Sequence, residues 1–454
     1  MKNFKSWAKI IAIVIGIVSC SDGVDGNIPP VSDTQIIAFQ FLAADNIALT
    51  EDIIGVINES KKTITAIVPD STDVTALLPQ IAVPLDAIIT PTGIQDFSVP
   101  VLYTVTAEDG TTAIYTVTTK ISDRDILIAL YNANPENTLG WDITTPDTST
   151  WDGVITNGEG NVIELNLTGK NISILPAKMG QLAQLSLLNL LNNNLSSIPA
   201  EMGKLSNLTY LNLGSNNLSS LPVEIWQLNQ LKDLTIYNND FSTIPAEIIQ
   251  LKNLLTLSLS NNPIPSLPDE LWQLTQLESL SLSTTSLTSV PDELSQLVNL
   301  TYLSLDNNNL SSVPIEEIGQ LSKLTYLNLG HCELTHIPSE ILLLNNLESL
   351  QLYNNNLTSI PVEIRQLTNL TSLAIFNNDL SSLPVEIGEL TGLTYLSLFN
   401  NSLNSVPEEL GLLTNLEILD LLENNLTTIP QVVCDLETAH GTTIKKDALV
   451  TCMP

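Results

Sequence analysis

The chain of 454 residues is long enough for two or three domains, and its 43% hydrophobic content is ample for packed cores. It has 49 acidic residues against 16 basic ones, which gives a formal net charge of −33 at pH 7. Nucleic acid and anionic membrane surfaces repel so acidic a chain, so neither is expected as a partner.

The first twenty residues have the layout of an export signal. Three lysines within the first nine residues precede an apolar run that ends in Ser19 and Cys20. This predicts a signal peptide over residues 1–19, because the run is about half of the roughly 20 residues that a membrane-spanning helix needs. Residues 17–20 resemble a bacterial lipobox, which implies acylation of Cys20 and attachment to a membrane. The alternative is an ordinary secretory signal with a chance cysteine.

Residues 20–33 are rich in Gly, Pro, Ser and Asp and are predicted to be a lipid-anchored tether. Over residues 34–122 apolar side chains alternate with period two, and Asp109-Gly110 marks a hairpin turn. The length fits about seven strands of an Ig-like β-sandwich. The stretch VLYTVTAEDGTTAIYTVTT resembles Ig-like domains that follow the tether in Gram-negative surface lipoproteins. We favour a spacer over a second ligand-binding module.

The remainder of the chain is a repeat array. Twelve prolines from Pro176 to Pro430 recur every 23 residues, with a single gap of 24 before Pro338. The unit LxxLxLxxNxLSSIPxEIGQLTN is the leucine-rich-repeat pattern, and it resembles the 23-residue class with LPxEIxxL on its convex side. We expect about 12 repeats over residues 162–430. The resemblance implies an α/β solenoid, a horseshoe with a parallel β-sheet on its concave face and short helices on its convex face.

One polar column of the repeat is predicted to point into the coil, where it satisfies backbone groups that the tight bend leaves unpaired. This structural ladder consists of Asn193, Asn216, Asn239, Asn262, Asn308, Cys332, Asn355, Asn378, Asn401 and Asn424, with Thr285 in the same column. The position makes Cys332 a small buried residue and not a nucleophile.

Both open ends of a solenoid need a cap. Residues 123–161 contain Trp141 and Trp151 and resemble the N-terminal cap of plant receptor ectodomains, although they lack its cysteines. Residues 431–454 are predicted to be the C-terminal cap. Cys434 and Cys452 lie there and are a candidate disulfide in an export compartment.

Residues suited to catalysis are scarce. The chain has three histidines and no HExxH, GxSxG or glycine-rich phosphate motif. The repeat phase places His331 on the concave face and Cys332 in the core, so the two cannot share a metal. We therefore expect no enzymatic activity, no metal site and no cofactor.

The outward columns of the concave sheet hold half of the sixteen tyrosines and phenylalanines. These predicted ligand-binding residues are Tyr210, Tyr237, Tyr302, Tyr326, Tyr353, Phe376, Tyr395 and Phe399. Strands lie about 4.8 Å apart, so Tyr353, Phe376 and Phe399 are expected to form an aromatic ladder about 10 Å long. The same columns carry five acids and no lysine or arginine. Exposed aromatic patches mark contact sites, although rings can also pair only to stabilise a sheet.

Rings among small polar groups suit a protein hot spot and equally suit stacking on sugars. The sequence therefore predicts a non-catalytic binding or adhesion protein, lipid-anchored at the bacterial outer membrane or cell surface, that binds a protein or glycan. One alternative is an accessory glycan-capture lipoprotein of a polysaccharide-uptake system. Another is a signalling-type scaffold, which the LPxEIxxL class resembles and which the signal peptide argues against.

Overall fold

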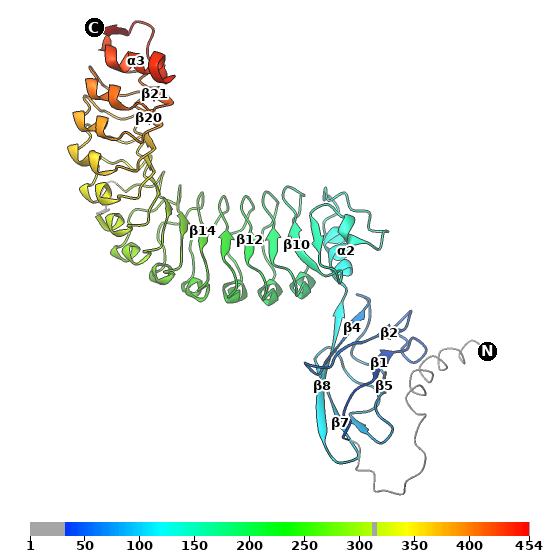
Figure 1. Ribbon diagram of the computed structural model, residues 1–454. Helices are drawn as coiled ribbons and strands as arrows, with labels where there is room; N and C mark the ends of the chain where they lie inside the picture. The colour runs from blue at the N-terminus through cyan, green and yellow to red at the C-terminus, as the bar shows by residue number, and fades with distance from the viewer. Residues whose placement is uncertain (1–31, 311–315, 454) are drawn as a thin grey trace. The chain divides into compact units, whose positions relative to one another are not determined.

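The computed structural model describes residues 32–310 and 316–453 (Figure 1). The predicted signal peptide, Cys20 and most of the predicted tether lie outside the described residues. The chain divides between Lys120 and Ile121 into two compact units. None of the helices in the described part is long and apolar enough to cross a bilayer.

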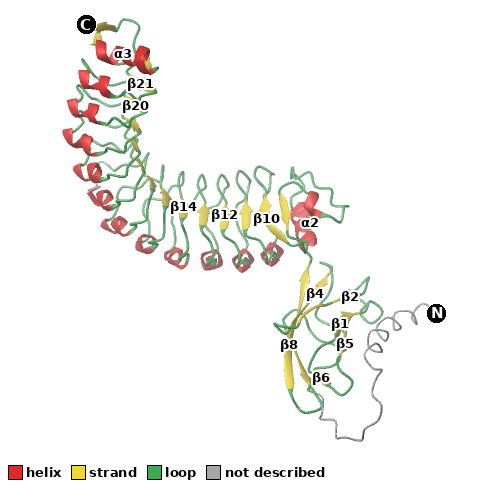
Figure 2. Ribbon diagram, in the orientation of Figure 1, coloured by secondary structure: helices red, strands yellow, loops and turns green. Residues whose placement is uncertain are grey.

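The first unit is all β and consists of two sheets, with strand orders β2-β1-β5 and β3-β4-β8-β7-β6 (Figure 2). Its strands are β1 (Ala38–Phe41), β2 (Ile53–Ile54), β3 (Val56–Asn58), β4 (Thr63–Val68), β5 (Pro79–Ala82), β6 (Ile88–Thr90), β7 (Val101–Thr106) and β8 (Thr112–Ile121).

The period-two pattern explains the packing of this unit. Tyr103 pairs with Tyr115 across β7 and β8, and Gly110 closes the turn between them at φ +86°, which glycine adopts readily. The Phe39 ring of one sheet lies 6.2 Å from the Tyr103 ring of the other, so the two sheets share one core. The predicted all-β sandwich is therefore confirmed.

The second unit contains a sheet of 14 strands whose order follows the sequence from β9 to β21 and ends with β23. Strand β9 is antiparallel to β10, and the others are parallel. The strands are β9 (Val154–Thr156), β10 (Val162–Asn166), β11 (Leu187–Asn189), β12 (Tyr210–Asn212), β13 (Asp233–Thr235), β14 (Thr256–Ser258), β15 (Ser279–Ser281), β16 (Tyr302–Ser304), β17 (Tyr326–Asn328), β18 (Ser349–Gln351), β19 (Ser372–Ala374), β20 (Tyr395–Ser397), β21 (Ile418–Asp420) and β23 (Thr443–Lys445).

Short 3-10 helices line the opposite side of each coil (Figure 2). They are η3 (Ala177–Gln181), η4 (Ala200–Lys204), η5 (Val223–Gln227), η6 (Ala246–Gln250), η7 (Asp269–Gln273), η8 (Asp292–Gln296), η9 (Glu316–Gln320), η10 (Ser339–Leu343), η11 (Val362–Gln366), η12 (Val385–Glu389) and η13 (Glu408–Leu412). Proline begins the turn because its φ is already set, as at Pro222, whose carbonyl accepts from the Ile225 N–H at 3.0 Å. The predicted leucine-rich-repeat solenoid is confirmed, and its helices are of the tighter 3-10 type.

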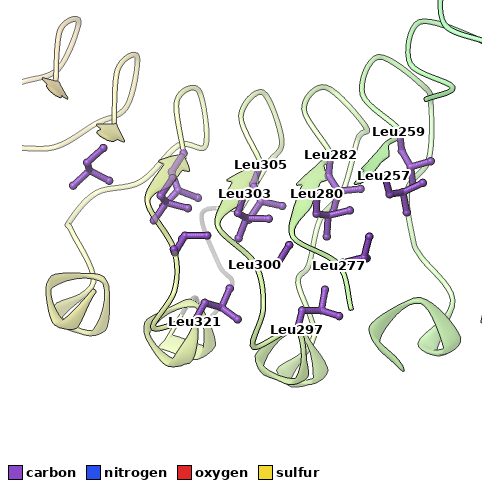
Figure 3. Packing of buried hydrophobic residues seen from close by; sticks show 14 of the residues in the cluster. Leu257, Leu259, Leu277, Leu280, Leu282, Leu297, Leu300, Leu303, Leu305 and Leu321 are labelled. Carbon is purple, nitrogen blue, oxygen red and sulfur yellow. The ribbon is translucent and has the colours of Figure 1, made fainter. Parts of the chain in front are cut away.

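Leucines fill the space between the strands and the helices. Figure 3 shows Leu280 and Leu303 projecting inward from neighbouring strands, and both are fully buried. The buried leucines of successive coils belong to a single hydrophobic cluster, so the array shares one continuous core. The 24-residue repeat keeps this register, since Tyr302 pairs with Tyr326 on the next strand.

The inward asparagines bond the bends of adjacent coils together. Asn216, for example, donates from Nδ2 to the carbonyls of Leu190 and Leu213 at 3.0 and 2.9 Å, and its Oδ1 accepts from the Leu195 N–H at 3.0 Å. Cys332 takes the same place with weaker contacts, from Sγ to the Gly330 carbonyl at 3.4 Å. Each ladder side chain therefore satisfies backbone groups that the coil cannot pair internally.

Both ends of the array are covered. At the N-terminal end lie α2 (Asp123–Ala133) and η2 (Thr148–Thr150), with Trp141 stacked on Trp151 at 4.9 Å. At the C-terminal end lie β22 (Thr428–Pro430), α3 (Gln431–His440) and β24 (Thr451–Met453). Cys434 of α3 forms a disulfide with Cys452 of β24, which ties the last strand to the terminal helix.

Candidate functional site

The concave face is built from three outward columns, because residues alternate sides along each strand. The first column is the first residue of each strand, the middle column is the third residue, and the third column lies two residues further on. On β17 these positions are Tyr326, Asn328 and Gly330, while Leu327 and Leu329 between them are fully buried. The columns run along the array with one residue per repeat.

All eight predicted aromatic residues lie in these columns and are partly exposed. The first column holds Tyr210, Tyr302, Tyr326 and Tyr395, and the third column holds Tyr237, Tyr353, Phe376 and Phe399.

Two pairs of rings stack across neighbouring strands. The rings of Tyr302 and Tyr326 lie 4.5 Å apart with their planes at 5°, and those of Tyr353 and Phe376 lie 4.9 Å apart, also at 5°. Phe399 is on the next strand, but within the described residues no ring stack joins it to Phe376. The expected three-ring ladder is therefore a stacked pair followed by a separate ring.

Two glycines in the third column make room for these rings, and the sequence analysis missed them. A Cβ at Gly330 would lie 2.5 Å from the Tyr353 ring, and one at Gly214 would lie 2.7 Å from the Tyr237 ring. Both tyrosines thus lean back over the preceding repeat. Each glycine comes one repeat before a tyrosine in the same column, and this spacing is the signal that could have revealed the two glycines.

The middle column forms a polar floor beneath the rings. Ser304, Ala374 and Ser397 face outward but are only 1–2% exposed, because the flanking columns cover them. A middle-column hydroxyl can also bond to the third column, as between Ser281 and Ser260 at 2.7 Å. Around the stacks, the face therefore combines partly exposed rings with the hydrogen-bonding hydroxyls of serines.

A strip of polar side chains runs beside the third column, at residues with φ of 50 to 55°. Asn354 lies 2.6 Å from the Nε2 atom of His331, Asn377 donates to Asn354 at 2.6 Å, and Asn400 donates to Asn377 at 2.9 Å. Asparagine tolerates this left-handed conformation, so the backbone accounts for the residue type. The strip places amides next to the aromatic column.

Burial raises the pKa of two phenol groups on this face. It raises the pKa of Tyr326 to about 12, and the neighbouring Tyr302 and Tyr353 add to the rise. Burial also raises the pKa of Tyr353, and the Asp306 carboxylate contributes to both shifts. The phenol groups therefore remain protonated and can donate hydrogen bonds.

The C-terminal cap changes the charge of the face at one end. Strand β23 pairs with β21 and places Lys445 beside Asp420, with Nζ and Oδ2 3.3 Å apart. The expectation of outward columns without lysine therefore holds only within the repeats. The repeat pattern does not predict this strand, because Ile444 is its only large apolar residue.

His331 is exposed on the concave face whereas Cys332 is buried, as the repeat phase predicts. Burial raises the pKa of the Cys332 thiol to about 12, which keeps it protonated. Across residues 32–310 and 316–453, no three His, Cys, Asp or Glu side chains are grouped so that they could hold a metal ion.

Comparison with protein families gives two matches. Residues 201–312 and 303–402 match the leucine-rich repeat region, and residues 43–119 match the family described as SGBP, N-terminal, where SGBP denotes surface glycan-binding protein. Comparison with curated proteins gives no match.

Among solved structures, a leucine-rich-repeat protein of Leptospira interrogans is 39% identical with a TM-score of 0.58, over 62% of this chain and 71% of that one. The ectodomain of the Arabidopsis receptor kinase HAESA, in complex with a peptide hormone, is 26% identical with a TM-score of 0.62, over 73% and 57%. An internalin from Listeria monocytogenes, at 21% identity over 65% and 86% with a TM-score of 0.56, shares the fold. The chain belongs to the leucine-rich-repeat family and carries an N-terminal domain of the SGBP type.

Proposed function

We propose that the concave face is the ligand-binding surface of a non-catalytic binding or adhesion protein displayed at the bacterial cell surface. The observation that carries this proposal is the two stacked pairs of rings, Tyr302 with Tyr326 and Tyr353 with Phe376, left partly exposed above a polar floor. Exposed aromatic side chains on a protein surface typically mark a contact site.

Two ligand classes fit this face. The plant receptor ectodomain that resembles the array was solved with a peptide ligand, which supports a protein or peptide. The match of residues 43–119 to the SGBP family supports the second candidate, capture of a glycan beside a polysaccharide-uptake system. In both stacks one face of each ring is covered by its partner, which leaves only the outer faces for a sugar.

Surface display would depend on the lipid anchor at Cys20 and on the first unit as a spacer. The lysines and apolar run before Cys20 motivate this part of the proposal. Metabolic labelling with a palmitate analogue should label the wild-type chain and not Cys20→Ala. An unlabelled wild-type chain would exclude the anchor and leave the binding face unaffected.

The binding face can be tested on purified residues 21–454. The wild type and the triple variant Tyr353→Ser/Phe376→Ser/Phe399→Ser are compared for binding to envelope proteins and purified oligosaccharides of neighbouring cells. A matched control removes three partly exposed valines from the convex helices, Val223→Ser/Val362→Ser/Val385→Ser.

The proposal predicts that the concave variant loses a ligand that the wild type and the convex control retain. Saturable binding of a pure oligosaccharide would select glycan capture, and binding of a protein would select adhesion. Equal binding by all three correctly folded chains would contradict a concave site.

A further inference from the structure

A buried carboxylate lies in the third column of the concave face. Asp306 is 9% exposed, and its Oδ1 accepts hydrogen bonds from the hydroxyls of Ser283 at 2.5 Å and Ser304 at 2.6 Å. Its Oδ2 accepts from the side-chain amide of Asn307 at 3.0 Å. All three donors are neutral, so they orient the carboxylate without cancelling its charge.

The hydrogen bonding of Asp306 is incomplete. A carboxylate has about four acceptor positions, and the three donors leave one of them, on Oδ2, unfilled. No lysine, arginine or histidine within the described ranges forms an ion pair with it. A buried charge without a counter-charge is costly, and such groups in proteins are normally paired.

Aromatic rings stand next to this carboxylate. Tyr326 begins the neighbouring strand, and Gly330 occupies the third column between Asp306 and Tyr353. Gly330 has no side chain, so none stands in that column between the carboxylate and the Tyr353 ring, which leans over the glycine. Burial raises the pKa of both tyrosines, and the charge of the carboxylate adds to the rise.

We infer that Asp306, together with the rings of Tyr326 and Tyr353, forms a subsite for a cationic group, and that the ligand is a basic polypeptide segment that places a lysine or arginine side chain there. The inference rests on the proposed function and specifies the ligand class. An ammonium or guanidinium group supplies the missing donor, the counter-charge and a cation–π contact together. A neutral sugar supplies only the donor.

The charge of the whole chain supports the same partner. A net charge of −33 attracts a basic polypeptide from a distance, and the outward columns within the repeats carry no lysine or arginine to repel it. Long-range attraction does not determine where on the face a cationic group binds. The test must therefore distinguish the loss of the Asp306 contact from the loss of any one negative charge.

The probe is an acetylated octalysine peptide, measured by calorimetry against residues 21–454. Asp306→Asn is compared with Asp233→Asn, which removes an equal charge from the first column of the same face, at a position outside both ring stacks. Removing a charge-assisted hydrogen bond should weaken binding about tenfold in Asp306→Asn. The Asp233→Asn variant should change it by less than about twofold, because the charge it removes is largely screened.

Equal losses in the two variants would overturn the subsite. If Asp306→Asn fails to fold, Tyr353→Leu decides, with an expected loss of about threefold from the missing cation–π contact. Binding of a glucosamine oligosaccharide that depends on Asp306, with no binding of octalysine, would overturn the polypeptide assignment. If the triple aromatic variant loses an isolated ligand that Asp306→Asn still binds, the proposed function stands and the cationic subsite does not.

Discussion

Gly330→Ala tests whether the stacked rings are held in place for binding. A Cβ at this residue would lie 2.5 Å from the Cε2 and Cζ atoms of Tyr353. Carbon atoms pack at about 3.5–4.0 Å, so the ring must move by about 1 Å or more. The backbone there is outside the left-handed region, so alanine adds no conformational strain of its own. The substitution therefore acts through the ring.

The ring that must move is stacked on Phe376 at 4.9 Å, and such a pair contributes about 0.5–1.5 kcal/mol. We expect the free energy of unfolding, from urea titration, to fall by about 1 kcal/mol and ligand affinity to fall about three- to tenfold. Gly214→Ala is the matched control, since it displaces Tyr237, which stands outside the stacks. Wild-type stability and binding in Gly330→Ala, or equal losses in the control, would refute this reasoning.

Three further predictions concern groups away from the rings. Asn262→Ala leaves the buried Phe241 N–H without its acceptor, so the free energy of unfolding measured in urea should fall by about 3 kcal/mol. A loss below about 1 kcal/mol would contradict the structural role of the ladder. With a pKa near 12, the Cys332 thiol should resist Ellman's reagent at pH 8 until urea unfolds the array, and rapid reaction of the native chain would show that it is accessible. The Tyr103 hydroxyl is buried with no hydrogen-bond partner in the described chain, so Tyr103→Phe should stabilise the first unit by about 1 kcal/mol in thermal unfolding, and a lower Tm would argue for a bonded hydroxyl.

The repeat spacing predicts most of the second unit, because each position in a coil has one environment. The phase of Leu211 and Leu213 alone places Tyr210 on the concave face and Asn216 inside the coil. The same argument separates exposed His331 from buried Cys332. Periodic positions are therefore the part of the site that sequence determines.

Features that depend on contacts between repeats were not predictable in this way. Asp306 occupies an outward column, where an exposed acid is expected, yet it is buried by residues from adjacent coils. The role of Gly330 depends on the direction in which the Tyr353 ring leans. Strand β23 lies beyond the last repeat, pairs with β21, and has Ile444 alone in place of the two strand leucines that mark a repeat.

The central claim is that the ligand covers the concave face, and amide hydrogen exchange of residues 21–454 with and without a captured ligand tests it most directly. The account predicts added protection on strands β16–β20 and in the residues that immediately follow them, including Gly330 and Asn354. Protection confined to the first unit or to the convex helices η3–η13 would contradict it.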